Sequence, residues 1–586
     1  MTPHQNKHAA KTAYEIMDLP QGKPGFVRII HVGAGASGLL AAYKAKKMLH
    51  NYELVCYDKN GEVGGTWLKN RYPGCACDIP AHLYTYTFEP NPDWSGFYVY
   101  GPEIYDYFLK FYRKYELEEF VRLNTEVLSA TWDEGNVIWK VKLRRDGEVF
   151  DDYCHVLING SGVFSDPRLP SVPGLDQFQG TVMHSADWDP SFETRGKRVA
   201  VIGTGSSSIQ MVAKIAQDAE HLTVFMRSST WIAPQIFEDA QQVAEDGEPI
   251  AAVGKHYYTQ REIEAFKKDP ELFLAYRKDL ETRMTRNFDV FLSGSEASQG
   301  AKALFKERML ARIGLGHEEL KQHLIPDWSP GCRRMTPGEG YLEALTQPNV
   351  ECVFDEISVA TQTGLQTSNG NLYKFDVIAC GTGFNVTFTP HFKIVGANGV
   401  IMQEELAEEP RLYCSITAPG YPNYFVVNGP RGNWGQGGVL PSLSFPRKES
   451  MARTNRRQTE VQLEYAFQCV QKMQKDGIKA MEVKRKPTDD FNDHTDLWHP
   501  KYSVWAEDCR SWYKMGTKDG KVHIWPGSIL HLLQFLKTPR FEHYDIRYKN
   551  DNSFAFLGNG KTEAELDPDN HDLAPFIRTQ DTPWEL

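Results

Sequence analysis

The sequence predicts an α/β fold with two Rossmann-like dinucleotide-binding domains and a mostly helical insertion. Two glycine-rich turns, VGAGASG at 32–38 and VIGTGSS at 201–207, each follow an apolar strand and precede a helix, which is the pattern of a βαβ unit. Residues 255–325 are instead rich in helix-forming residues, with charges at helical spacing. A chain of 586 residues is long enough for several domains, each with its own core.

These patterns divide the chain into three parts. We expect the first dinucleotide-binding domain to begin with residues 25–164 and to be completed by residues 388–586, which also form the C-terminal region. The second domain is expected over residues 165–387, interrupted by the helical insertion at about 232–330.

Shorter segments have their own patterns. Residues 122–163 predict antiparallel hairpins, closed by turns at 133–136 and 146–147 and followed by an apolar strand. The pattern of residues 447–485 is helical, and the remaining residues read as aromatic-rich loops and short elements.

The first glycine-rich turn has the G-x-G-x-x-G spacing of a dinucleotide site. Gly33 permits the tight turn, Gly35 lets the backbone approach a pyrophosphate, and Gly38 allows close packing of the helix. The positive end of the helix dipole favours the pyrophosphate, and Ser37 stands in the same turn. Asp58 follows the last glycine by 20 residues, where a carboxylate accepts hydrogen bonds from a ribose hydroxyl.

The second turn departs from this spacing at one position. Gly203 and Gly205 are present, but Ser208 stands where a third glycine is expected, and serine is small enough to preserve the packing. The strand that follows ends in Arg227 and Ser228 instead of an acid. Because arginine can clamp a 2′-phosphate with two hydrogen bonds, the second site is predicted to bind NADP(H) in preference to NAD(H).

Two dinucleotide sites in one chain indicate a tightly held flavin, FAD, and an exchangeable nicotinamide. The turn GEVGGTW at 61–67 offers a further glycine pair for backbone approach to the flavin. Disulfide reductases of this architecture carry a C-x-x-x-x-C pair after that turn, whereas this chain has Cys75 and Cys77 with one residue between them. Thiol redox chemistry is therefore not expected. The ten cysteines have no C-x-x-C spacing, so we expect no metal site and mostly buried, reduced thiols.

Bulk composition limits the partners and the compartment. A net charge of −11 argues against nucleic acid, which requires a basic face. No apolar run is long enough for a membrane span, and the first 25 residues lack a secretory apolar stretch. We therefore expect a cytoplasmic protein with no membrane partner. Nothing in the sequence indicates its oligomeric state.

A third motif connects the two glycine-rich turns to a known family. Residues 178–189, FQGTVMHSADWD, fit F-x-G-x-x-x-H-x-x-x-W followed by Pro or Asp at every fixed position, with Phe178, Gly180, His184, Trp188 and Asp189. The signature G-G-x-W-x(4)-[FY]-P-G-x(3)-D is met by Gly64, Gly65, Trp67, Tyr72, Pro73, Gly74 and Asp78. With the GTGF turn at 381–384, the chain resembles the type I (class B) flavoprotein Baeyer–Villiger monooxygenases over about residues 27–440.

The resemblance implies a reaction and a catalytic pair. Members of this family use NADPH and FAD to insert one oxygen atom of O₂ next to a ketone carbonyl, through a C4a-peroxyflavin, giving an ester or lactone. Arg334 matches the family's essential arginine, and Asp78 matches the carboxylate that positions it. Arg333 matches the neighbour that holds the 2′-phosphate, while Met335 replaces a usual proline. His184 and Trp188 are implied to couple domain motion to catalysis and not to perform chemistry.

The same matching implies which residues contact the cofactors. Those expected at FAD are Gly64, Gly65, Thr66, Trp67, Asp78, Tyr84 and Val127. Those expected at the NADP pyrophosphate are Thr204, Gly205, Ser206, Ser207, Ser208, Ile209 and Gln210. Ala76 and Cys77 are expected near the nicotinamide, and Trp512 in a mobile loop that closes over NADP.

Two other functions stay open. A class B flavin monooxygenase can oxidise nitrogen or sulfur, but such enzymes generally lack both the aspartate at position 78 and the paired arginines. A non-catalytic flavoprotein that senses NADPH by domain closure is the other alternative. The partners expected for the preferred reading are a small-molecule ketone and O₂.

Overall fold

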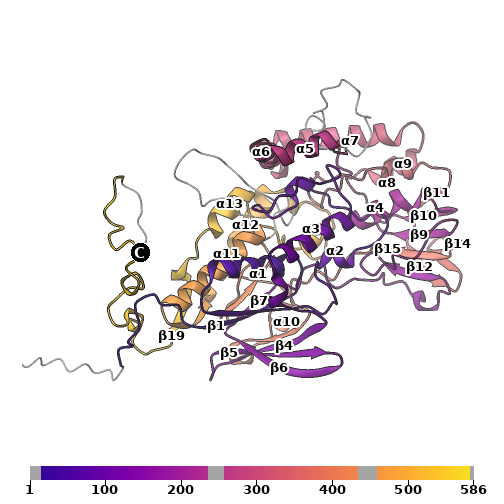
Figure 1. Cartoon of the computed structure of the whole chain (residues 1–586). Helices are drawn as coiled ribbons and strands as arrows, with labels where there is room; N and C mark the ends of the chain where they lie inside the picture. Colours follow the sequence, from indigo (N-terminus) through magenta and orange to yellow (C-terminus); the bar gives the residue numbers. More distant parts are fainter. Residues whose placement is uncertain (1–14, 235–256, 433–457, 581–586) are drawn as a thin grey trace, which may run out of the picture.

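The computed structural model describes residues 15–234, 257–432 and 458–580. Two parallel sheets form the centres of two α/β units, and a layer of helices lies across the top of both in the view of Figure 1. Within the described residues, no helix is both long and apolar enough to cross a membrane.

The first sheet has five parallel strands and contains the first glycine-rich turn. Every residue of its central strand is buried, as expected where helices cover both faces of a parallel sheet. Helix α1 (Ala36–Met48) follows that strand as the sequence predicts. The strand order is β17 (Tyr424–Val426), β7 (Val156–Asn159), β1 (Val27–Val32), β2 (Tyr52–Tyr57) and β3 (Val121–Arg122). Since β17 pairs with β7, the chain returns to this sheet after completing the second one.

The second sheet has the same architecture. Helix α4 (Ser206–Ile215) follows its central strand, and the short helix α9 (Tyr341–Ala344) packs against α4. The strand order is β11 (Val350–Val353), β10 (His221–Phe225), β9 (Arg198–Ile202), β15 (Val377–Cys380) and β8 (Thr181–His184). Strand β8 lies inside the motif at 178–189, which as a sequence shows no strand period. Its four residues are too few for a period, and pairing with β15 makes them a strand.

Two smaller sheets extend the units, one mixed and one antiparallel. The hairpins predicted over residues 122–163 are confirmed, and the turn at Asp146 and Gly147 has positive φ at both residues, as a tight two-residue hairpin requires. One sheet contains β16 (Lys393–Val395), β4 (Thr125–Asp133), β5 (Ile138–Arg145) and β6 (Glu148–Cys154). The other contains β12 (Ile357–Thr361), β13 (Gly364–Thr367) and β14 (Leu372–Lys374).

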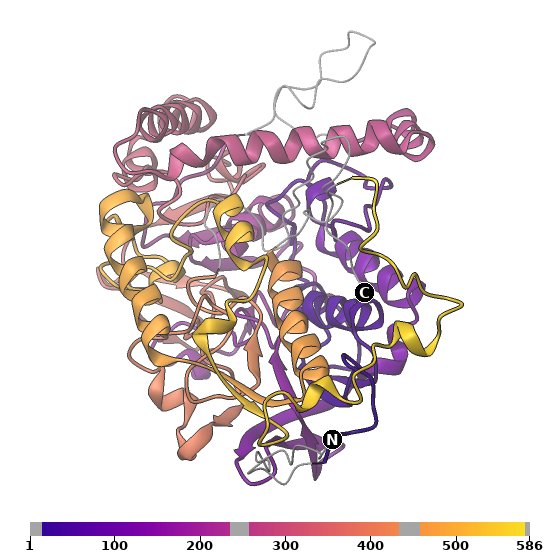
Figure 2. The same cartoon turned by 90° about the vertical axis from the view of Figure 1, so that its left-hand side faces the viewer.

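The helical insertion is confirmed over its described part. Its helices begin at clear signals: Thr259 and Glu262 form a capping box, and Asp269 caps the next helix just before Pro270. The helices are α5 (Gln260–Lys268), α6 (Pro270–Arg286), α7 (Glu296–Ile313) and α8 (Glu318–Leu324), seen edge-on at the top of Figure 2. Residues 235–256 of the predicted insertion lie outside the described residues.

The region after residue 457 differs in part from the prediction. The helix predicted at 447–485 is α11 (Gln458–Lys475), followed by β18 (Ile478–Val483) in place of further helix, and the residues before 458 lie outside the description. Helix α12 (Arg485–Tyr502) stands where loops were expected. Its buried face consists of Thr488, Asn492, Thr495 and His499, so the helical period is carried by polar residues that a hydrophobic pattern does not reveal. The other helix and strand of this region are α13 (Ile529–Leu536) and β19 (Tyr544–Tyr548), and earlier in the chain lie helices α3 (Gly101–Lys114) and α10 (Met402–Glu405).

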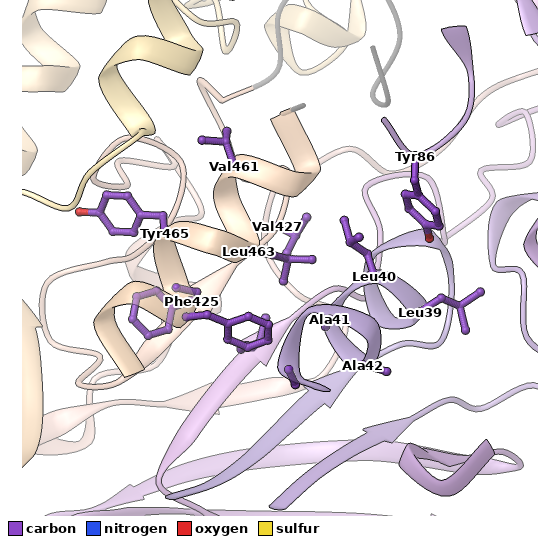
Figure 3. Packing of buried hydrophobic residues seen from close by; sticks show 14 of the residues in the cluster. Leu39, Leu40, Ala41, Ala42, Tyr86, Phe425, Val427, Val461, Leu463 and Tyr465 are labelled. Carbon is purple, nitrogen blue, oxygen red and sulfur yellow. The ribbon is translucent and has the colours of Figure 1, made fainter. Parts of the chain in front are cut away.

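One core joins the two ends of the chain. Helix α11 packs against α1, and Figure 3 shows Leu463 of α11 on the side that faces Leu40 of α1. Phe425, on the returning strand β17, belongs to the same cluster. Burying such side chains contributes about 1.5–3 kcal/mol each, so the C-terminal region stabilises the first glycine-rich turn directly.

Candidate active site

The first glycine-rich turn leaves no room for side chains. Gly33 has φ of +101°, and a Cβ there would lie 2.7 Å from the carbonyl oxygen of Gly160. A Cβ on Gly38 would lie 2.2 Å from the carbonyl oxygen of Gly33. Both contacts are far below van der Waals distance, so the strand and the helix approach closely only because these residues are glycine.

The predicted flavin turn lies against the same helix terminus. A Cβ on Gly35 would lie 3.3 Å from the Cα of Gly65, and Gly65 itself has positive φ. Gly64 has φ of +118°, and Thr66 begins the short helix α2 (Thr66–Lys69). Helix α1 has no side-chain cap. The two turns therefore form a cradle of backbone at an uncapped helix N-terminus, which fits a pyrophosphate.

Asp58 closes the cradle at the carboxyl end of β2. Its Oδ2 accepts a hydrogen bond of 2.7 Å from the backbone N–H of Ala34, and its Oδ1 accepts one of 2.8 Å from Asn60. The hydroxyl of Ser37 lies 3.5 Å from the carbonyl oxygen of Gly160. Asp58 is thus held beside the turn, in the position that a ribose-binding carboxylate requires.

The second glycine-rich turn repeats this geometry with serine in the third place. A Cβ on Gly203 would lie 2.6 Å from the carbonyl oxygen of Gly381, to which the hydroxyl of Ser208 donates. Gly205 caps α4 through its backbone alone and faces open space. Serine fits here because Gly381 has no side chain: a Cβ on Gly381 would lie 1.9 Å from the Ser208 hydroxyl oxygen.

Two guanidinium groups flank this turn. Arg227 is exposed just after β10, and Arg333 donates a hydrogen bond of 3.0 Å to the carbonyl oxygen of Ser229. Burial lowers the pKa of Arg333, and the nearby positive charge of Arg227 lowers it further. Within the described ranges neither arginine has an ion pair with a carboxylate. Adjacent cations without a counter-charge fit a dianionic phosphate.

Arg334 forms an ion pair with Asp78 across the two units. Its Nε and Nη2 donate to the two carboxylate oxygens, each at 2.7 Å. The two side chains are 23% and 18% exposed. Burial acts to lower the pKa of Arg334, but the charge and hydrogen bonds of Asp78 outweigh it, so the pKa lies above its usual range. The site therefore holds a permanent cation in one orientation.

Contacts around this pair hold the first unit against α4. The side-chain amide of Gln210 donates to the carbonyl oxygen of Ala76 at 2.9 Å, and its oxygen accepts from the Tyr72 hydroxyl at 2.7 Å. Ser206 and Thr336 share a hydrogen bond of 2.6 Å, so the α4 N-terminus is tied to the segment just after Arg334. The structure thus brings residues that were predicted for NADP and residues that were predicted for FAD together at one place.

Several predicted residues have neighbouring positions. The indole of Trp67 donates to the Tyr84 hydroxyl at 3.2 Å. Cys77 is buried, and burial raises its pKa well above the usual value. The Thr204 hydroxyl donates to the carbonyl oxygen of Ser228 at 3.0 Å. Ile209 is buried in the core of the second unit.

Ser207 and Val127 have different surroundings in the structure. Ser207, half-buried on the first turn of α4, interacts with Tyr72 of the flavin-side signature. Val127 lies on β4, two residues after Thr125, whose N–H donates to the carbonyl oxygen of Asp58. Its side chain belongs to the same hydrophobic cluster as Val32 and Tyr57. The structure therefore brings Ser207 to the interface of the two units and leaves Val127 in a core.

The motif at 178–189 supports the connection between the two units. Linker residues 160–168 and 381–385 run antiparallel, with the N–H of Arg168 donating to Gly383 and the N–H of Asn385 donating to Asp166. His184 Nδ1 accepts from a backbone N–H, so its Nε2 donates to the Gly383 carbonyl oxygen at 2.9 Å. Burial lowers the pKa of His184, which keeps the ring neutral. Trp188 is buried in the second unit.

Trp512 lies in residues 503–524, which we call the C-terminal loop. Its ring packs against that of Phe164 of the first linker, with 5.1 Å between the ring centroids, and Phe164 in turn packs against Phe384 of the second linker, with 5.5 Å between the centroids. Tyr513 is buried and interacts electrostatically with Arg334. Phe164 and Tyr513 were not predicted from the sequence, and Phe384 entered only as the last residue of the GTGF turn. Their contacts with Trp512 and Arg334 arise only through the fold.

One cysteine expectation is wrong. Cys332 and Cys509 form a disulfide, with their Cα atoms 6.3 Å apart, whereas all ten were expected to be reduced. The pair was invisible in the sequence because 177 residues separate its members. The other eight cysteines are free, and all but Cys352 are buried.

Comparisons with known proteins agree with this geometry. Residues 27–244 match the flavin-binding monooxygenase-like family. The FAD-binding monooxygenase tazF of Aspergillus terreus is 39% identical over 94% of this chain and 96% of its own length. A Baeyer-Villiger monooxygenase of Pseudomonas aeruginosa is 28% identical over 85% of this chain and 88% of its own. The structure of cyclohexanone monooxygenase from Rhodococcus sp. Phi1 bound to NADP⁺ aligns with TM-score 0.73 and 25% identity, covering 90% of this chain and 100% of that one.

Proposed function

The chain belongs to the family of flavin-binding monooxygenases, and we propose that it is a Baeyer–Villiger enzyme, inserting one oxygen atom of O₂ next to a ketone carbonyl. As a member of this family it is an NADPH-dependent flavoprotein monooxygenase that binds FAD and NADP(H). The product of the proposed reaction is an ester or a lactone, and the substrates are a small-molecule ketone and O₂.

The Arg334–Asp78 pair carries the proposal. Bound FAD, once reduced by NADPH, supplies the activation of O₂. Oxygen transfer to a carbonyl carbon develops negative charge on oxygen, and a fixed cation in a site of low polarity stabilises such charge strongly. Arg334 stays protonated throughout the accessible pH range, and its two hydrogen bonds to Asp78 fix the plane of the guanidinium. The cation therefore needs no reorganisation during the reaction.

We assign the cofactors to the two units by their charge and shape. The cradle of Gly33, Gly35 and Gly65 with Asp58 suits FAD, held by residues 25–164 and 388–586. The uncapped α4 N-terminus with Arg227 and Arg333 suits NADP(H), held by residues 165–387. The linker contacts of His184 support a role in the movement of one unit against the other.

A direct experiment separates this reaction from the alternatives. The FAD-loaded enzyme is given NADPH in air with linear, cyclic and polycyclic ketones, and with amines and sulfides. NADPH consumption and product mass are recorded. A rise in turnover with a ketone, and a product heavier by one oxygen atom, supports the proposal. If only amines or sulfides raise turnover, the enzyme oxidises nitrogen or sulfur. If no substrate raises it above NADPH oxidation alone, the proposal is wrong.

The role of Arg334 has its own test. Arg334→Ala is expected to retain FAD and the anaerobic reduction of FAD by NADPH, while product formation falls at least ~100-fold, the usual cost of losing a charge-stabilising donor. Arg198→Ala is the matched control, because it also removes an arginine–aspartate pair but at the opposite, amino end of the second sheet. Product formation by Arg334→Ala at nearly the parental rate would refute the assignment.

A further inference from the structure

The disulfide between Cys332 and Cys509 joins the two segments that surround the arginine pair. Cys332 directly precedes Arg333 and Arg334, and Cys509 stands three residues before Trp512 on the C-terminal loop. The Cα separation of 6.3 Å allows the bond without backbone movement. A single covalent bond therefore fastens the C-terminal loop to the segment that carries Arg334.

Non-covalent contacts hold the same two segments weakly by comparison. The N–H of Ser329 donates to the Glu507 carboxylate at 2.6 Å, and Tyr513 interacts electrostatically with Arg334. A small core of Val504, Trp505, Tyr513, Val522 and Ile524 also includes Phe291, and four further residues from outside the C-terminal loop pack against it: Phe288, Val290, Met335 and Trp498. The ends of the loop are thus anchored in the fold, through this core and through hydrogen bonds such as the one from the Arg431 N–H to His523. Most of the described hydrogen bonds of residues 507–520 lie within the loop itself, so this middle part can move once the disulfide is broken.

The C-terminal loop also reaches the linkers between the two units. Four aromatic rings form a row from Trp512 through Phe164 and Phe384 to His184. The distances between successive ring centroids are 5.1, 5.5 and 5.6 Å. Tyr513, the next residue after Trp512, interacts with Arg334. A change in the position of the loop therefore acts on both the linkers and the arginine pair.

We propose that Cys332 and Cys509 form a redox latch: the disulfide holds the C-terminal loop closed, and its reduction releases the loop and with it NADP⁺. This inference rests on the proposed function for the place of NADP beside the loop. A structural disulfide would stay oxidised throughout, whereas a latch changes state with the redox conditions. Both sulfurs are buried, Cys332 completely, so a thiol reductant reaches the disulfide through transient local opening of the chain around it.

The chemistry of the latch balances with a hydroperoxide as oxidant and a dithiol as reductant. One cysteine sulfur attacks H₂O₂, the O–O bond breaks, and a sulfenic acid and water form. The second thiol attacks that sulfur, the S–O bond breaks, and the disulfide and a second water form. The sum is two thiols plus H₂O₂ giving one disulfide plus two waters, a two-electron oxidation. A dithiol reverses it by thiol–disulfide exchange and itself becomes a cyclic disulfide. Flavin monooxygenases supply the oxidant themselves whenever NADPH is oxidised without oxygen insertion.

The test compares oxidised and reduced holoenzyme directly. The FAD-loaded protein is treated with H₂O₂ or with dithiothreitol, free thiols are alkylated, and peptides are mapped without reduction. We expect the 332–509 cross-link only in the oxidised sample. In the reduced sample we expect NADP⁺ to dissociate at least 5-fold faster and KM for NADPH to rise. FAD reduction at saturating NADPH should change less than 2-fold, because hydride transfer takes place with NADPH already bound.

Variants and controls complete the design. Cys332→Ser and Cys509→Ser should behave as the reduced enzyme under both conditions, while Cys352→Ser, which removes a free and partly exposed thiol, should respond like the parent. Should a serine variant not fold, the comparison of the parent in its two redox states still decides. Equal NADP⁺ dissociation in the two states, absence of the cross-link after oxidation, or a cross-link that dithiothreitol cannot break in the folded enzyme would each overturn the latch. Peptide mapping and NADP⁺ dissociation need no ketone, so the latch and the oxygen-insertion proposal can fail separately.

Discussion

Replacing Asp78 by asparagine isolates the charge of the arginine pair at almost unchanged volume. The parent has two charge-assisted hydrogen bonds of 2.7 Å, and asparagine keeps only one acceptor oxygen for them. Breaking a fully buried ion pair costs about 3–5 kcal/mol, and an exposed pair contributes about 0.2–1 kcal/mol. Because the two side chains are 23% and 18% exposed and one hydrogen bond remains, we expect the free energy of unfolding to fall by about 2 kcal/mol in Asp78→Asn.

The assay measures that loss both in stability and in turnover. Urea unfolding followed by tryptophan fluorescence gives the change in the free energy of unfolding. Product formation at saturating NADPH gives the change in the transition state. If the transition state loses the same 2 kcal/mol of stabilisation, kcat falls about 30-fold. FAD content and FAD reduction by NADPH should stay near parental values, since Asp78 acts through Arg334.

Asp376→Asn is the matched control for this prediction. Asp376 also holds an arginine with both oxygens, Arg198 at 3.2 and 2.7 Å, but this pair is about 40% exposed and lies at the opposite end of the sheet. Its loss should cost less than about 1 kcal/mol and leave turnover unchanged. Equal stability losses in the two variants, or unchanged turnover in Asp78→Asn, would refute the reasoning.

Three further predictions follow from the described contacts. Arg227→Ala should raise KM for NADPH by about 10-fold to 100-fold, which corresponds to the binding free energy of one hydrogen bond to a charged group, and should raise KM for NADH far less. Arg195→Ala is the control, because Arg195 is exposed and has one long ion pair. Equal changes in KM for the two cofactors would exclude the 2′-phosphate role. Burial, aided by the charge of nearby Arg277, lowers the pKa of His82 to about 3. As the pH drops below 6.5 the histidine is protonated in the unfolded state but not in the folded state, so the free energy of unfolding falls, by about 2 kcal/mol for this residue at pH 5. His82→Phe should remove that part of the pH dependence of urea unfolding, and an unchanged pH dependence would contradict the prediction. Gly381→Ala should lower the free energy of unfolding by about 1–3 kcal/mol, because the new Cβ clashes with the Ser208 hydroxyl. In a double-mutant cycle, adding Ser208→Gly should recover most of this loss. If the losses of the two single variants simply add, the contact is not the cause.

The sequence was most informative where one local feature determines a conformation. Gly33 and Gly38 predicted a close approach of strand and helix, and the structure leaves no space for a Cβ at either. Asp58 was expected at the carboxyl end of a strand, and it lies there, bonded to the turn. Such features depend on backbone sterics and on a short stretch of chain, which the sequence displays directly.

Features that depend on distant residues were predicted poorly or only through the family resemblance. Helix α12 was missed because its buried face is polar, with Asn492 donating to the carbonyl oxygen of Leu412 in place of apolar contacts. The pairing of Arg334 with Asp78 came from matching signatures, since 256 residues separate them.

The sequence by itself determined two nucleotide-binding turns, their order along the chain and the preference for a phosphorylated nicotinamide cofactor, because glycine sterics and local charge act within a few residues. Only the tertiary structure decided that Arg334 meets Asp78, that the two linkers run side by side under His184, and that Cys332 reaches Cys509. Each of these contacts joins segments whose closeness depends on the packing of both sheets and of the C-terminal region. No local pattern carries that information.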